Sequence, residues 1–193
     1  MAVRRPAVSA IQLLQLLKPT RKILGVVSLK VQNQWHVGTA LSDPYLSHAS
    51  ALPPFLPWSS TSSFATPPVD ALIALAKAEC ADAVVLGLPV EGQDDPDAVA
   101  RRDALLHHLV QSPHTPAIIV SVSDAPPATT SHVVEEFAKN ILWDSLQVPN
   151  LQLLQHPTAV SVAPATDQAC LHAGISLQMW LDKHCGGWAN TFG

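Results

Sequence analysis

The stretch ADAVVLGLPVEG, residues 81–92, decides the fold class of this 193-residue chain. Its apolar and β-branched run ends in Gly87-Leu88-Pro89 and then gives way to acidic and polar residues. A run of this length, bounded by Gly and Pro, predicts a strand that is buried on both faces and opens into a loop. In open α/β sheets this C-terminal edge is where functional residues are usually placed. Read alone, the Gly-Leu-Pro sequence is explained by a tight strand exit.

The segments around this strand alternate between strand and helix patterns. Residues 22–31 and 35–41 predict two strands that a polar turn, residues 32–34, joins into a hairpin. The remaining expected elements are helices at 69–80, 95–111, 129–143 and 165–184, strands at 83–88 and 115–122, and a short strand within 46–68. A hairpin followed by βα units predicts one mixed sheet with helices on both faces, an α/β arrangement that several three-layer folds share.

Composition favours a single domain with a sizeable core, because 48% of the residues are hydrophobic and only 13% are charged. No run approaches the roughly 20 apolar residues that a membrane-spanning helix needs. The three cysteines, Cys80, Cys170 and Cys185, have neither the number nor the spacing of a disulfide framework or a zinc site. The sequence also contains no glycine-rich motif for binding a nucleotide cofactor.

The charge of the chain is unevenly distributed. Residues 1–42 hold six Lys and Arg and no acidic residue, whereas the rest of the chain holds all 15 Asp and Glu. Residues 1–21 therefore predict a basic, amphipathic arm with two open interpretations. It is either a targeting segment, in the first place mitochondrial, or the ordinary first helix of a cytoplasmic protein, ending at Lys18-Pro19. The candidate cations for contact with RNA phosphate are Arg4, Arg5, Lys18, Arg21 and Lys22.

Four segments, in this order, resemble the YqgF/RuvX family. They are ILGVV at 23–27 with GTALSDP at 38–44, the stretch at 81–92, the helix at 97–110, and ATDQACLHAGISLQMWLD at 165–182. The matching residues include Gly38, Ala40, Ser42, Asp43, Pro44, the run Leu86 to Pro89, Asp167, Ala169, Ala173, Leu177, Leu181 and Asp182. The resemblance implies a ribonuclease H-like three-layer fold over residues 22–185, with the arm before it and a tail at 186–193. It also implies ancestry among nucleases that act on ribosomal RNA precursors or Holliday junctions.

The nuclease chemistry that this resemblance implies depends on three carboxylates that converge on Mg²⁺ or Mn²⁺. The first would lie on the first strand, where this chain has Val27 or, with a shift of one residue, Ser28. The second would follow the strand at 115–122, where Asp124 stands without its expected acidic and basic neighbours. The third would begin the last helix, where Asp167 matches.

Asp124 and Asp167 are thus the residual catalytic and metal-binding candidates, and Asp43 or Glu91 could substitute only from neighbouring positions. One or two carboxylates make a poor Mg²⁺ site, so the sequence favours a protein that has lost nuclease activity and needs no cofactor. We expect a structural or assembly subunit of an RNA–protein complex, such as a mitochondrial ribosome, that contacts protein subunits and touches structured RNA through its basic arm. The alternative is an active, divergent endonuclease, dependent on Mg²⁺ or Mn²⁺, in ribosomal RNA processing or Holliday junction resolution.

Overall fold

The computed structural model describes residues 7–31, 33–52, 69–89, 95–112, 118–124 and 165–186, with side chains at all of these except 31 and 165–167. In chain order the elements are α1 (Ala10–Leu16), β1 (Lys22–Val31), β2 (Gln34–Ser42), β3 (Ala49–Ala51), α2 (Val69–Ala78), β4 (Ala81–Leu86), α3 (Pro96–Gln111), β5 (Ile119–Val122) and α6 (Ala165–Cys185). The elements expected in these ranges are confirmed, with small differences at their ends. The helix predicted at 129–143 lies outside the described residues.

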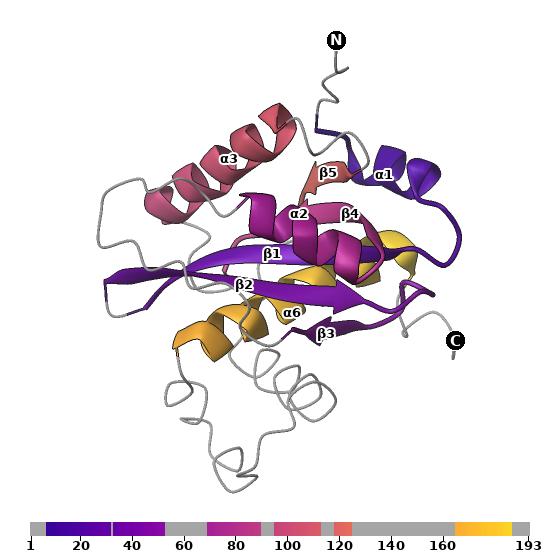
Figure 1. Ribbon diagram of the computed structural model, residues 1–193. Helices are drawn as coiled ribbons and strands as arrows, with labels where there is room; N and C mark the ends of the chain where they lie inside the picture. Colours follow the sequence, from indigo (N-terminus) through magenta and orange to yellow (C-terminus); the bar gives the residue numbers. More distant parts are fainter. Residues whose placement is uncertain are drawn as a thin grey trace, which may run out of the picture.

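The five strands form one mixed sheet in the order β3-β2-β1-β4-β5 (Figure 1). β1 pairs antiparallel with β2, which pairs antiparallel with β3, whereas β4 runs parallel to both β1 and β5. Figure 1 shows α2 in front of the sheet and α6 behind it. The predicted α/β arrangement, with an antiparallel hairpin first, parallel βα units after it and helices on both faces, is thereby confirmed (Figure 1).

Two hydrophobic cores fill the spaces between these layers, because successive side chains of a strand point to opposite faces of the sheet. On β1, Leu24 and Val26 pack with α2 and α3, whereas Ile23 and Val27 pack with α1 and α6. Trp180 on α6 is the largest of the fully buried side chains. Burial of one Leu, Ile or Val side chain contributes about 1.5–3 kcal/mol. The many such side chains in the two cores therefore hold the helices on the sheet.

The helix α1 belongs to this packed body. Its N-terminus is capped reciprocally: the hydroxyl of Ser9 accepts from the backbone N–H of Gln12, whose side chain accepts from the backbone N–H of Ser9. Before the helix, Val8 forms a parallel bridge with Ser121 of β5. Buried Leu13 lies in the same core as α6. For these residues the structure shows a short helix that packs on the domain through Ala10 and Leu13 and leaves Ile11 and Leu16 exposed, whatever its role in targeting.

Two glycines allow α6 to approach the sheet closely. A β-carbon at Gly38, on β2, would overlap the backbone carbonyl of Ala169. A β-carbon at Gly87, just after β4, would overlap the hydroxyl of Ser176. Both glycines belong to the quoted sequence motifs. In the folded protein, the absence of a side chain at each of them allows α6 to pack closely against the sheet.

The helix α6, at 21 residues, is the longest that the structure describes. Neither α6 nor any other described helix is both long enough and apolar enough to cross a membrane.

Candidate functional site

The site expected from the sequence would bring together β1, the end of β5 and the beginning of α6. Val27 on β1 pairs with Gly38 on β2, and Gly38 lies against the backbone of Ala169, near the beginning of α6. A β-carbon at Gly87 would meet both Ser176 and Val27, so Val27 lies beside the part of α6 that contains Ser176. Position 167 is nine residues earlier on α6, so the contacts do not bring the first and the third of the three expected carboxylate positions together.

The first of these positions holds no carboxylate. Val27 is 1% exposed and packs into the core beneath α6, so its side chain offers only apolar contact. Ser28 is 5% exposed, and its buried hydroxyl has no hydrogen-bond partner among the described residues. Mg²⁺ binds to hard, preferably anionic oxygen ligands. Neither residue supplies the charge that such a cation needs.

Asp124, at the second expected position, is held by two basic side chains near the end of α6. Its Oδ2 atom lies 2.9 Å from Nζ of Lys183, and its Oδ1 atom lies 2.6 Å from Nε2 of His184. Lys183 also donates to the backbone carbonyl of Asp124, at 2.7 Å. Burial acts to raise the pKa of the Asp124 carboxyl, but the hydrogen bonds and positive charges of Lys183 and His184 outweigh it and hold the pKa below its ordinary value.

Asp124 and Asp167 are therefore associated with opposite ends of α6. Position 167 and Lys183, which contacts Asp124, are 16 residues apart on this helix. At a rise of about 1.5 Å per residue, this separation is about 24 Å. The cations of a two-metal site lie about 3.5–4 Å apart, so the structure does not bring these two residues to one metal centre.

Asp43 does not replace the missing ligand. Its carboxylate accepts from the backbone N–H groups of Ser47 and His48 and from the hydroxyl of Ser47, at 2.7–3.1 Å. This is the turn-forming role that a short acidic side chain commonly has. Asp43 also follows the end of β2 that lies beside the beginning of β1, away from Val27. The other possible substitute, Glu91, lies outside the described residues.

The neighbours of Asp124 do not form a nucleophilic site either. Cys185 follows His184 in the sequence, but burial, and then the negative charge of Asp182, raise the pKa of Cys185 to about 11. Its thiol is protonated at neutral pH, and a protonated thiol is a poor nucleophile and a poor metal ligand. Across the ranges that the structure describes, no group of three His, Cys, Asp or Glu side chains could hold a metal ion.

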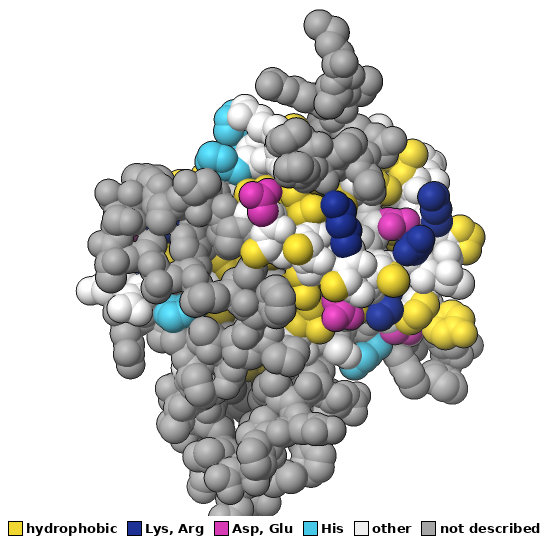
Figure 2. Space-filling view, in the orientation of Figure 1, with side chains coloured by type: hydrophobic (Ala, Val, Ile, Leu, Met, Phe, Trp, Pro, Cys, Tyr) yellow, Lys and Arg dark blue, Asp and Glu magenta, His cyan; other side chains and the backbone are white. Residues whose placement is uncertain are grey.

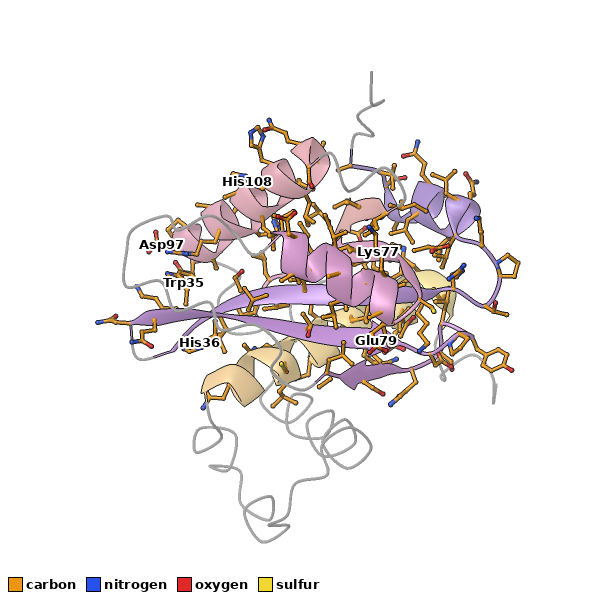
Figure 3. The ribbon with its side chains drawn as sticks, viewed as in Figure 1. Trp35, His36, Lys77, Glu79, Asp97 and His108 are labelled. Carbon is orange, nitrogen blue, oxygen red and sulfur yellow. The ribbon has the colours of Figure 1, made fainter. Side chains whose placement is uncertain are left out.

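The far end of the β1–β2 hairpin is fastened by α3. The guanidinium group of Arg101 lies over the ring of Trp35, 4.4 Å from the ring centroid. Figure 3 shows Trp35 below the end of α3 that carries Asp97, with His36 next to it on the hairpin. Burial lowers the pKa of His36, which favours the neutral imidazole at pH 7. These residues have a packing role at the hairpin end.

The predicted RNA-binding cations are described in part. Arg4 and Arg5 lie outside the described residues. Lys18 follows the end of α1, and Lys22 is the first residue of β1. Arg21, between them, forms an ion pair with a carboxylate on β4.

One further cation was not predicted from the sequence. Lys77 lies in the last turn of α2, where its backbone carbonyl accepts from the N–H of Cys80. The carbonyl of Cys80 in turn accepts from the N–H of Lys22. Lys77 and Lys22 are neighbours only because β4 pairs with β1, and no local pattern in the sequence signals that proximity.

Comparisons with known proteins leave the family open. No protein-family model matches this chain, and no curated protein matches it. Among solved structures, the chain is similar to one from the cryo-EM structure of the simian T-cell lymphotropic virus intasome in complex with PP2A regulatory subunit B56 gamma, at 14% identity and a TM-score of 0.29. The match covers 86% of this chain and 49% of that chain, so this chain spans about half of its length. A likeness this weak contributes nothing to the account of the site.

Proposed function

We propose that this protein is a non-catalytic, YqgF-like protein with a ribonuclease H-like fold, and that it serves as a structural or assembly subunit of an RNA–protein complex such as the mitochondrial ribosome. The observation that carries the proposal is the engagement of Asp124 by Lys183 and His184. The residue that resembles a metal ligand is here part of a contact that fastens the end of β5 to α6.

Conversion of this arrangement into a metal site would need two costly changes. Asp124 would have to leave Lys183 and His184 and move toward position 167, about 24 Å along α6 by helix rise. A carboxylate would also have to replace Val27, which packs in an apolar core, where an uncompensated charge is strongly unfavourable. Both requirements support a protein without metal-dependent hydrolysis.

The motif residues that resemble the nuclease family have packing roles in this chain. Gly38 and Gly87 allow α6 to pack closely on the sheet, and Asp43 closes the turn after β2. A domain with this scaffold and no metal ligand on β1 is suited to presenting its surfaces to other molecules. Such surfaces would contact protein subunits on the body and RNA at the basic N-terminal region.

Sedimentation of the full-length, tagged chain from gently lysed cells tests the proposal. Mitochondrial and cytosolic extracts are prepared separately, and each is run on a sucrose gradient with and without ribonuclease. We expect the protein to sediment with a large particle from the mitochondrial extract and to shift toward lighter fractions after ribonuclease treatment. Cross-linking and mass spectrometry then identify the neighbouring subunits. Sedimentation of all the protein as a free chain in both extracts would contradict the proposal.

A further inference from the structure

A group of cations lies at the end of the sheet where the parallel strands β1 and β4 begin. We infer that Lys18, Arg21, Lys22 and Lys77, which we call the basic rim, form a binding surface for the phosphate backbone of RNA. The inference rests on the proposed function and deepens it, because it names the surface that meets the RNA and adds a residue from outside the N-terminal arm.

Backbone hydrogen bonds join the two segments that carry the basic rim, residues 18–22 and 77–80. The N–H of Arg21 donates to the carbonyl of Lys18 at 3.2 Å, and the N–H of Lys22 donates to the carbonyl of Cys80 at 3.5 Å. The N–H of Cys80 donates to the carbonyl of Lys77 at 3.2 Å. The folded domain therefore holds Lys77 beside a segment that lies more than 50 residues earlier in the sequence.

The basic rim lies on the side of the sheet that α2 covers. Because side chains alternate along a strand, Lys22 lies on the same face of β1 as Leu24, which packs with α2. Figure 2 shows several Lys and Arg side chains on this side of the molecule, with Asp and Glu side chains among them. Figure 3 places Lys77 on α2 on this side as well. The four cations thus come from segments whose backbones are neighbours at one end of the sheet.

Three carboxylates lie near the basic rim and leave it with a small net positive charge: Asp82, Glu79, and Asp43, which follows β2 beside the first residue of β1. Asp82, the extra residue of a β-bulge in β4, has its Oδ2 atom 3.4 Å from Nε of Arg21. Glu79 follows α2. Within the described part of the chain, Arg21 is the one rim cation that a carboxylate pairs.

A surface of this kind on an acidic chain favours RNA as its partner. The whole chain has a net charge of −4, so attraction to phosphate is concentrated where Lys and Arg gather. Contacts of Lys and Arg with phosphate contribute affinity and orientation without reading sequence. The basic rim therefore would position an RNA backbone against the domain, independently of base sequence.

Fluorescence anisotropy with the full-length protein and a labelled RNA stem-loop tests this inference over a series of KCl concentrations. The variants Lys22→Gln and Lys77→Gln should each weaken binding and reduce the salt dependence by about one phosphate contact. Lys30→Gln is the matched control, because Lys30 is exposed near the hairpin tip, at the opposite end of β1. Lys30→Gln should leave the affinity and its salt dependence unchanged.

A gain-of-affinity variant guards against misfolding as the explanation. Asp82→Asn releases Arg21 from its carboxylate, and we expect RNA to bind more tightly, by about 1.5- to 5-fold. Unchanged RNA affinity in both Lys22→Gln and Lys77→Gln overturns the inference. It is also overturned if polyglutamate displaces the protein from the labelled stem-loop as readily as unlabelled RNA does. If wild-type protein fails to bind the stem-loop and still sediments with a large particle, the RNA-binding role of the basic rim is overturned and the proposed function is left standing.

Discussion

The Nε2 atom of His184 lies 2.6 Å from the Oδ1 atom of Asp124, and this contact connects the last turn of α6 to the end of β5. The His184 ring also lies against the ring of buried Trp180, with 4.9 Å between the centroids. The imidazole is therefore positioned from two sides. Asp124 acts in this place as a structural anchor for the C-terminal part of α6.

Asp124→Asn removes the negative charge from between Lys183 and His184. Because the Asp124 side chain is 58% exposed, solvent screens these pairs, and we expect the free energy of unfolding to fall by only about 0.5–1 kcal/mol. Urea titration at pH 7 measures the change. Asp103→Asn is a suitable control, because Asp103 is similarly exposed and pairs only with the adjacent Arg102 in the described structure. A loss as large for Asp103→Asn as for Asp124→Asn would contradict the anchoring role.

The same variant makes a prediction about pH. The pKa of Asp124 is lower in the folded protein than its ordinary value of 3.8, so the unfolded chain takes up this proton first as the pH falls. The stabilisation is complete above that ordinary value and is lost as the pH falls through the lowered folded pKa. Stability curves of wild type and Asp124→Asn should therefore converge only in strong acid. A difference that stays constant throughout the acid range would exclude the ion pairs as its source.

Gly87→Ala places a methyl group against the hydroxyl of Ser176. We expect a loss of about 1–3 kcal/mol, the usual cost of overpacking a core. Ser176→Ala removes that hydroxyl, so the double variant should recover part of the loss in a double-mutant cycle. Strict additivity of the two single changes would show that α6 does not rest on Gly87. Gly38→Ala should be harmful in either background, because it meets the backbone of Ala169, which cannot be truncated.

Gln178 on α6 holds the edge strand β3. Its Oε1 atom accepts from the backbone N–H of Ala49 at 2.8 Å, and its Nε2 atom donates to the carbonyl of Ser47 at 3.2 Å. Gln178→Ala leaves the buried N–H of Ala49 unsatisfied, at a cost of about 1–3 kcal/mol. Hydrogen exchange should accelerate at the amide of Ala49. Gln111→Ala, at an exposed helix end where Gln111 contacts His107, should leave that exchange rate unchanged, and unchanged exchange in both variants would refute the role of Gln178.

The parts of the fold that depend on local pattern were predictable from the sequence. The apolar run before Pro89 indicated a buried strand at 83–88, where β4 spans Ala81–Leu86, and the patterns at 22–31 and 35–41 indicated the hairpin. Both are present because burial on one or both faces of a sheet imposes that pattern on the residues themselves. The motif glycines were noticed for a family resemblance, whereas their physical role, the close approach of α6, needed the packed structure.

The pairing of charged residues was not predictable in the same way. Asp124 and His184 are 60 residues apart, and Asp124 was a possible metal ligand only through the resemblance to the nuclease family. Nothing in the local sequence specifies which end of a 21-residue helix reaches the end of β5. Lys77 was missed for the same reason, since its proximity to Lys22 depends on the pairing of β4 with β1.

The central claim, that the α/β domain of this chain performs no metal-dependent hydrolysis, is tested most directly by a cleavage assay. Purified full-length protein is incubated with a labelled four-way DNA junction and with a labelled RNA stem-loop, each in the presence of Mg²⁺ or Mn²⁺. We expect no cleavage above that seen with Asp167→Asn prepared in the same way. Cleavage that requires the divalent cation and disappears in Asp167→Asn would contradict the account.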